Sequence, residues 1–167
     1  MQTTLNKIRE HQPCKEGWEK LLKNLKKTKS DDEPLLLLTI LDSNGLDDAL
    51  WCMRAIDGRD KEIRLYAVWC ARQVQHLMKD PRSLAALDVA ERFANGEATV
   101  EELDAARAVA RGAAWDAAWA AAWAAAGDAA RAAAGAAARK SAVWDAARVA
   151  QEARLREVCN EVQGEDK

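Results

Sequence analysis

Two histidines and one cysteine are the first residues to consider for metal binding or catalysis. His11 and Cys14 have the His-x-x-Cys spacing that can supply two zinc ligands. No CxxC or HxxxH motif elsewhere in the sequence offers the remaining ligands. We therefore predict no metal site and interpret the pair as a surface histidine beside a packed cysteine. His11 and His76 also stand in no Ser/His/Asp order that would indicate nucleophilic catalysis.

Glycine-rich phosphate loops are missing from the sequence as well. Neither GxGxxG nor GxxxxGKS/T occurs, and the glycines stand singly at expected helix ends or in an Ala-rich stretch. The sequence therefore predicts a protein that is not an enzyme and has no cofactor.

Charged residues are dense on two helices that we expect between residues 59 and 96. Because an unpaired charge on a buried helix is costly, most of these groups should pair with one another. The alternative is that some of them line a binding surface. The candidate binding residues are Arg64, Arg72, His76, Asp80, Arg82, Asp88 and Glu91.

Basic residues gather near the N-terminus, although the chain has a net charge of -2 and a pI near 5.8. Residues 7–29 carry eight lysines and arginines against three glutamates. This segment is either a weak anion-facing patch or a solvated helix face. The overall charge argues against a general binder of nucleic acid or anionic membranes, which would need a strong basic excess.

The helix pair at residues 59–96 has the clearest boundaries, and we expect it to lie at the centre of the fold. Asp60 can cap the first helix, Asp80 with Pro81 opens the second, and Asn95-Gly96 supplies a left-handed stop. Apolar residues leave only a narrow polar stripe on the first helix, which is expected to reach residue 79. Most of its circumference should therefore be buried.

Shorter helices are expected before this pair. The apolar run at residues 35–41 could be a strand or a buried helix, and we favour a helix capped by Asp31 or Asp32 because no second strand is evident. Another helix should follow the turn at Ser43-Asn44-Gly45. An earlier helix should bury a face with helical spacing, formed by Trp18, Leu21, Leu22 and Leu25.

An Ala-rich half follows, opened by a capping box at Thr99 and Glu102. One unbroken helix from there to residue 162 would be about 95 Å long, so we expect a turn, placed between Gly135 and Ser141. The last helix should pack through Val143, Leu155, Val158 and Val162. The evenly spaced Trp115, Trp119 and Trp123 either fill the core between Ala helices, which we favour, or form an aromatic platform.

The spacing of the cysteines and the hydropathy of the chain indicate the cellular compartment in which the protein is found. The four cysteines, Cys14, Cys52, Cys70 and Cys159, lie far apart, and three occupy apolar helical positions where a free thiol packs as a small hydrophobe. The N-terminus has no apolar signal core, and the longest apolar run is much shorter than the ~20 residues of a membrane span. We predict a reduced, cytoplasmic protein that does not enter a membrane.

The stretch from Asn44 to Arg148 resembles a widespread helical family of bacteria and phages whose members are labelled immunity proteins. The resemblance implies a cytoplasmic helical protein that neutralises a toxin or a defence component by binding it, and it carries over no catalytic residue. It rests on the Leu65 to Cys70 segment, Arg72, His76-Leu77, Asp80, Arg82-Ser83, Ala90-Glu91-Arg92, Gly96 and Ala98-Thr99.

These observations predict an all-α, single-domain bundle of six to eight helices, with short helices in residues 1–98 and long Ala-rich helices in residues 99–163. The predicted function is non-enzymatic binding of another protein, as an immunity protein or a phage-encoded inhibitor. The alternative is an architectural or nucleic-acid-associated protein that uses the basic N-terminal segment. The sequence leaves homo-oligomerisation open.

Overall fold

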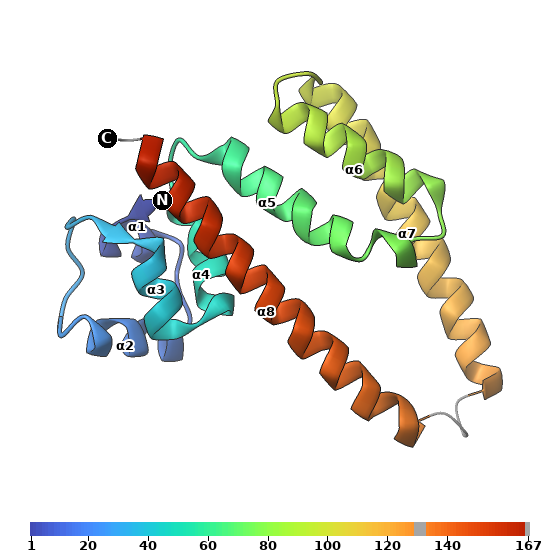
Figure 1. Ribbon diagram of the computed structural model, residues 1–167, viewed down its shortest axis with the longest axis horizontal. Coiled ribbons are helices and arrows are strands. Elements are labelled where there is room, and N and C mark those ends of the chain that lie inside the picture. Colours follow the sequence, from blue (N-terminus) through green and yellow to red (C-terminus); the bar gives the residue numbers. More distant parts are fainter. Residues whose placement is uncertain (129–132, 166–167) are drawn as a thin grey trace. The chain divides into compact units, whose positions relative to one another are not determined.

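The computed structural model describes the backbone of residues 1–128 and 133–165, and the side chains of residues 1–76, 78–114 and 145–164. In this part of the chain there are eight α-helices, two short 3-10 helices and one pair of two-residue strands (Figure 1). The predicted all-α class and the predicted number of helices are confirmed. None of the described helices combines the length and hydropathy that a membrane span requires.

The chain divides into two compact units by its internal contacts. Unit 1 comprises Met1–Asp60 and Glu152–Lys167, and unit 2 comprises Lys61–Gln151. The last helix, α8 (Ala133–Glu165), therefore contributes residues to both units. The single-domain interpretation stays a prediction.

Unit 1 begins with a small antiparallel strand pair. β1 (Gln2–Thr3) pairs with β2 (Leu35–Leu36), so that Gln2 lies opposite Leu36 and Thr3 opposite Leu35. The buried Thr3 hydroxyl donates a hydrogen bond to the carbonyl of Ala55. This pairing ties the N-terminus to the middle of the unit.

Short helices form the rest of the N-terminal part of unit 1. They are α1 (Leu5–Glu10), α2 (Lys15–Asn24), α3 (Leu37–Asn44), α4 (Leu46–Cys52) and the 3-10 helix η1 (Met53–Ala55). α3 packs against both α2 and α4. The expected turn before α4 is present, with Gly45 at a φ of 95°, a conformation that favours glycine.

The apolar run at residues 35–41 was predicted to be helical throughout, and this is wrong for its first two residues. Leu35 and Leu36 form β2, and α3 begins at Leu37 with Leu36 as an N-cap that makes no side-chain hydrogen bond. Asp31 and Asp32 do not cap it. A partner of only two residues at the N-terminus gives no strand pattern, so the sequence could not show the pairing.

The core of unit 1 joins its N-terminal helices to the end of α8. Leu155 and Cys159 of α8 are completely buried, as are Leu37 and Ile40 of α3. The predicted packing of the last helix through Leu155, Val158 and Val162 is confirmed, whereas the Val143 side chain lies outside the described residues. Residues more than a hundred positions apart therefore share one core.

Unit 2 contains the helix pair expected at the centre. α5 (Asp60–Gln73) is followed by the 3-10 helix η2 (Gln75–Leu77) and by α6 (Pro81–Ala94), which packs along α7 (Val100–Asp128) (Figure 1). Asp80 caps α6 through the amide of Arg82, and Gly96 ends that helix at a φ of 78°. The predicted boundaries of α6 are confirmed.

The capping box at the start of α7 is also confirmed. The Glu102 carboxylate accepts from the Thr99 amide at 2.8 Å, and the Thr99 hydroxyl accepts from the Glu102 amide at 3.2 Å. The two bonds satisfy backbone donors that the first turn of a helix would otherwise leave free.

The prediction that the first helix of this pair is mostly buried is wrong. α5 ends at Gln73 instead of reaching residue 79, and only Tyr66 and Val68 are buried on it. Trp69 is half-buried, and Val74 after the helix is exposed. It contacts α6 through long side chains such as Arg72, and the described residues of the two helices are not closely packed.

The predicted position of the turn in the Ala-rich half is wrong as well. Gly135 and Ser141 lie inside α8, which starts at Ala133, while α7 ends at Asp128. A single glycine among alanines lowers helix stability by only ~1 kcal/mol, so a helix can continue through it. The side chains of Trp115, Trp119 and Trp123, and hence their predicted role, lie outside the described residues.

Candidate binding surface

The seven candidate residues predicted from sequence all lie in unit 2, where most of them contact one another. Arg72 on α5 reaches α6: its Nη2 atom lies 2.6 Å from Asp88 Oδ1 and 2.8 Å from Glu91 Oε2. These hydrogen bonds, that to Glu91 first, raise the pKa of Arg72. The three groups therefore form an interhelical ion-pair cluster.

The remaining candidates are also engaged locally. Arg82 pairs with Asp80 at 2.7 Å, and this contact is the main cause that lowers the pKa of Asp80. The guanidinium of Arg64 lies 4.8 Å from the centre of the Phe93 ring, within cation–π range. His76 lies exposed in η2. The expectation that most of these charges pair internally agrees with this geometry, and none of the seven lines either of two depressions in unit 1.

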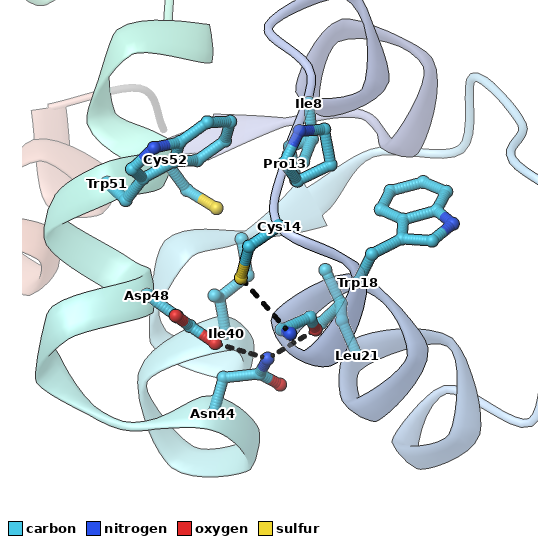
Figure 2. Close-up of a pocket in the computed structure, with 11 residues that line it drawn as sticks. Ile8, Pro13, Cys14, Trp18, Leu21, Ile40, Asn44, Asp48, Trp51 and Cys52 are labelled. Carbon is cyan, nitrogen blue, oxygen red and sulfur yellow. Dashed lines mark hydrogen bonds between the residues drawn. The ribbon is translucent and has the colours of Figure 1, made fainter.

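A pocket in unit 1 has the features of a binding site that the sequence did not reveal. It has a volume of about 110 Å³ and is enclosed by residues of α1, α2, α3 and α4 and the α1–α2 link (Figure 2). We call it the tryptophan pocket, and its lining consists of Ile8, Pro13, Cys14, Gly17, Trp18, Leu21, Ile40, Asn44, Asp48, Trp51 and Cys52.

One side of the tryptophan pocket is held by polar contacts among three helices. The Asn44 side-chain amide donates to the Gly17 carbonyl at 2.9 Å and to Asp48 Oδ2 at 2.8 Å (Figure 2). Cys14 caps α2, since its sulfur accepts from the Gly17 amide at 3.4 Å. A Cβ atom on Gly17 would lie 2.9 Å from Asp48 Oδ2, so a larger residue there would displace the carboxylate.

Two tryptophans border the pocket and remain partly exposed. Figure 2 shows the Trp18 and Trp51 rings on opposite sides of Pro13 and Cys14. The guanidinium of Arg54 stacks on the Trp51 ring at 4.4 Å from its centre and donates to the Trp51 carbonyl at 2.9 Å. Arg54 therefore contacts one face of the Trp51 ring.

The lining of the pocket is mainly apolar, with two cysteine thiols and one carboxylate. Burial, and after it the Asp48 charge, raises the pKa of the Cys52 thiol to about 12, so Cys52 is a neutral thiol near pH 7 and a poor nucleophile. The lining includes one carboxylate, Asp48, and no histidine that could serve as its acid–base partner. Apolar contact with a side chain or segment is what this site can provide.

A second, open depression adjoins Trp18. It has a volume of about 550 Å³, and we call it the basic groove because three cations and no carboxylate line it. Its lining consists of Arg9, Gln12, Pro13, Lys15, Trp18, Leu22, Thr28, Lys29 and Ser30.

The other basic residues of the N-terminal segment are partly neutralised. Lys7 pairs with Asp57 at 2.6 Å, Lys27 pairs with Asp31 and Glu33, and Lys20 donates to the Asn44 carbonyl at 3.1 Å. The segment is therefore not one continuous cationic face. Its portion around the basic groove holds three cations with no carboxylate among the lining residues.

The tryptophan pocket could be found only from the structure. Trp18 was assigned to a buried helix face, yet within that set only Leu21 is buried, and Trp18, Leu22 and Leu25 are half-buried. Trp51 has Asp47, Asp48 and Arg54 three or four residues away in a short helix, a spacing that could have pointed to an aromatic side chain on a polar helix face.

The two residues considered as zinc ligands, His11 and Cys14, do not form a metal site together with other described residues. His11 is exposed, as predicted, but the prediction of a packed cysteine beside it is wrong: Cys14 is exposed and its sulfur caps a helix. Across the described side chains, no group of three or more histidine, cysteine and carboxylate residues is placed to hold a metal ion. All four cysteines are free thiols, and the predicted packing of Cys52 and Cys159 in the interior is confirmed.

Comparison with known proteins adds no relative: neither protein-family models, nor curated protein sequences, nor solved structures match this chain.

Proposed function

We propose that this chain is a non-enzymatic protein-binding module whose binding surface in unit 1 is centred on the tryptophan pocket. The observation that carries the proposal is the pair of partly exposed tryptophans at an apolar pocket. Partly exposed tryptophans beside a preformed pocket are typical of binding hot spots, where aromatic anchors contribute most of the affinity.

The dimensions of the tryptophan pocket support a protein ligand. Sites for cofactors and drug-sized molecules typically enclose ~300–1,000 Å³ and bury most of the ligand. The pocket holds about 110 Å³, room for a single inserted side chain. A partner would gain further apolar contact from the flanking Trp18 and Trp51 rings.

The resemblance to immunity proteins gives the proposal its biological setting. In that setting the chain is cytoplasmic and neutralises a toxin or a bacterial defence component by stoichiometric binding, either as an immunity protein or as a phage-encoded inhibitor. The ion-pair cluster of Arg72, Asp88 and Glu91 then stabilises unit 2 instead of contacting the partner.

The basic groove favours one alternative, a nucleic-acid-associated protein. Three cations beside Trp18 could contact phosphates while the indole stacks on a base. Its affinity for nucleic acid would fall steeply with salt concentration, because phosphate contacts release counterions. The pairing of Lys7 and Lys27 with carboxylates, and the net charge of -2, weigh against it.

The experiment that tests the proposal is affinity capture from bacterial cells that express the tagged chain, with and without phage infection. The wild type is compared with Trp51→Ala and Trp18→Ala, and with Val149→Ala, a control at a residue that is 70% exposed on α8. Circular dichroism establishes that each variant is folded. We expect one protein to be captured in near-equal amount by the wild type and the control, and to be lost with either tryptophan variant.

The captured protein and the purified chain should then form a complex on their own. The proposal fails if the wild type captures nothing in stoichiometric amount, or if the folded tryptophan variants retain the same protein.

A further inference from the structure

We propose that the partner presents an acidic segment to unit 1, with one apolar side chain in the tryptophan pocket and carboxylates in the basic groove. This inference rests on the proposed protein-binding function and specifies the chemistry of the partner. It follows from the adjacency of the two depressions and from their charges.

The tryptophan pocket and the basic groove share a wall. Trp18 and Pro13 line both of them. A segment that inserts an apolar side chain on one side of Trp18 therefore places its neighbouring residues at the groove on the other side. The two depressions together form one composite surface.

The charges of the basic groove are available to a partner. Arg9 donates only a long hydrogen bond of 3.4 Å to the Ser30 hydroxyl, and Lys29 makes no ion pair with any described residue. The Lys15 ammonium lies 3.9 Å from Glu19, but its side chain is 87% exposed, so this contact is weak. Carboxylates entering the groove would meet three cations and, among its lining residues, no competing acid.

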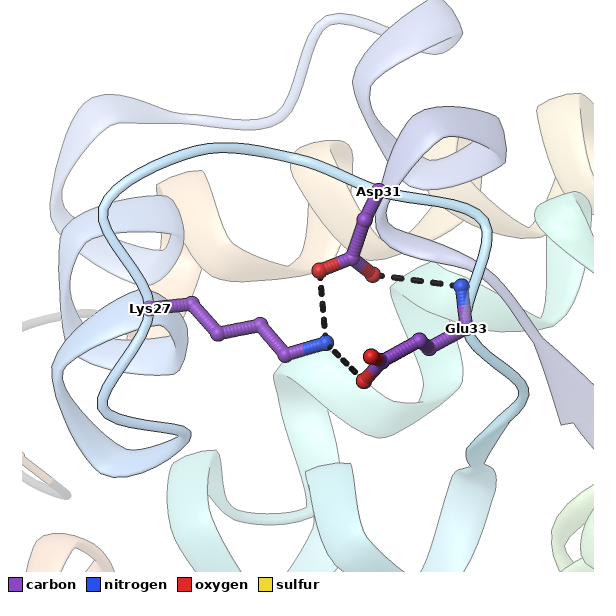
Figure 3. Close-up of polar contacts among 3 residues, drawn as sticks. All are labelled: Lys27, Asp31 and Glu33. Carbon is purple, nitrogen blue, oxygen red and sulfur yellow. Dashed lines mark hydrogen bonds and ion pairs between the residues drawn. The ribbon is translucent and has the colours of Figure 1, made fainter.

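One wall of the groove is held in place before a partner binds. Lys27 Nζ lies 2.6 Å from both Asp31 Oδ2 and Glu33 Oε2, which closes the loop around Thr28, Lys29 and Ser30 (Figure 3). The carbonyl of Asp31 also accepts from the Asn6 amide at 3.0 Å, which ties the loop to α1. A wall fixed in this way loses little conformational entropy when it binds.

A protein segment fits this composite surface better than a nucleic acid does. Nucleic acid binding needs a basic track along several phosphates, whereas here the cations end at an apolar pocket with Asp48 in its wall. A nucleic-acid backbone carries a phosphate at every step and would place one near that carboxylate, whereas a peptide can place an apolar residue there and its carboxylates in the groove. A peptide with an apolar residue beside aspartate or glutamate can fill the tryptophan pocket and pair with the cations of the basic groove.

Selection of random short peptides on the immobilised full-length chain tests this inference. We expect enrichment of peptides that carry one apolar residue beside aspartates or glutamates. Fluorescence anisotropy then measures the affinity of an enriched peptide for the wild type and for the double variant Arg9→Glu/Lys29→Glu. The control is Lys61→Glu/Lys79→Glu, which changes the net charge equally at exposed residues outside the groove.

Reversal of two groove charges should lower the affinity of the acidic peptide for the chain at least about tenfold, since like charges at an interface are strongly unfavourable. The control should bind as the wild type does. A peptide with its acidic residues changed to lysine should bind the groove variant more tightly than it binds the wild-type chain. A merely structural role of Arg9 and Lys29 would not produce this gain in affinity.

The inference is overturned if no peptide is enriched, if the enriched peptides are neutral or basic, or if the groove variant binds them unchanged. Tighter, salt-sensitive binding of a short oligothymidine strand would overturn it in favour of nucleic acid. Loss of the captured protein with Trp51→Ala but not with Arg9→Glu/Lys29→Glu would leave the proposed function intact and refute only the acidic segment.

Discussion

Unit 1 and unit 2 are both helical, but they differ in the side chains that they bury. In unit 1 the buried residues are mainly Leu, Ile, Met and Cys, drawn from the N-terminal helices and from the end of α8. In unit 2 the buried apolar side chains, among those described, are Tyr66, Val68, Leu103 and Ala113. α6 buries no residue completely.

The difference shows that helix propensity and burial are separate properties. Alanine favours a helix more than any other residue, so the sequence of unit 2 readily forms long helices. A buried leucine, however, contributes roughly 1.5–3 kcal/mol through the apolar surface removed from water, and a methyl group contributes much less. The interior that holds the pocket in place is therefore in unit 1.

The largest expected effect is on the core that the N-terminal helices share with α8. Leu155→Ala removes a completely buried side chain and should lower the free energy of unfolding by ~2–5 kcal/mol. Val149→Ala on the same helix, at a residue 70% exposed, should change it by less than ~0.5 kcal/mol. Urea denaturation measures both. Equal small effects would show that the end of α8 does not belong to the core.

Loss of the capping box in unit 2 should lower the free energy of unfolding by a smaller amount. Thr99→Ala removes the hydroxyl that accepts from the Glu102 amide and should destabilise the protein by ~1 kcal/mol. Thr99→Ser retains the hydroxyl and serves as the control. If the two variants have the same denaturation midpoint, the capping bond does not stabilise α7.

The Tyr66 hydroxyl in unit 2 should contribute about as much to the free energy of unfolding as the capping box does, or less. The Tyr66 hydroxyl donates to the Gln151 carbonyl of α8 at 2.9 Å. Tyr66→Phe keeps the ring but removes this donor and the contact of the hydroxyl with the Cys70 thiol, so we expect a loss of ~0.5–1.5 kcal/mol. A variant as stable as the wild type in thermal melting would argue that this bond exchanges freely with water.

The smallest effect should be the pH dependence of the Lys27 contacts. The hydrogen bond from Lys27 lowers the pKa of Asp31, and the bonds to Asp31 and Glu33 raise the pKa of Lys27. The contribution of Asp31 to stability is complete above its ordinary pKa of 3.8 and is lost as the pH falls through its lower folded value. The contribution of Lys27 to stability is complete below its ordinary pKa of 10.5 and is lost as the pH rises through its higher folded value.

Lys27→Gln is therefore expected to be less stable than the wild type near neutral pH, and the difference should shrink on acidification to about pH 2. Thermal melting of both proteins across this range measures the difference. A difference that is the same at both ends would mean that the Lys27 contacts are not ionic in origin.

Local signals in the sequence predicted much of the fold. Asp80 with Pro81, Asn95-Gly96 and the Thr99–Glu102 box each mark a helix boundary through contacts within a few residues, and the structure contains all of them. The buried face of Leu155, Val158 and Val162 was also evident from its spacing.

Features that depend on distant residues could not be predicted in this way. The β1–β2 pair joins residues more than thirty positions apart through only two residues on each side. The tryptophan pocket needs Asn44 to bridge Gly17 and Asp48, which no local pattern encodes. The helix at residues 60–73 was judged buried from its own composition, whereas burial depends on how closely other helices pack against it.

Hydrogen–deuterium exchange of the intact chain tests the central comparison most directly. If the core lies in unit 1, the slowest backbone amides should be those of Leu37 to Cys52 and of Leu155 to Val162, with faster exchange in α5 and α6. Slowest exchange within residues 61–94 instead would contradict the account and return the α5–α6 pair to the centre of the fold.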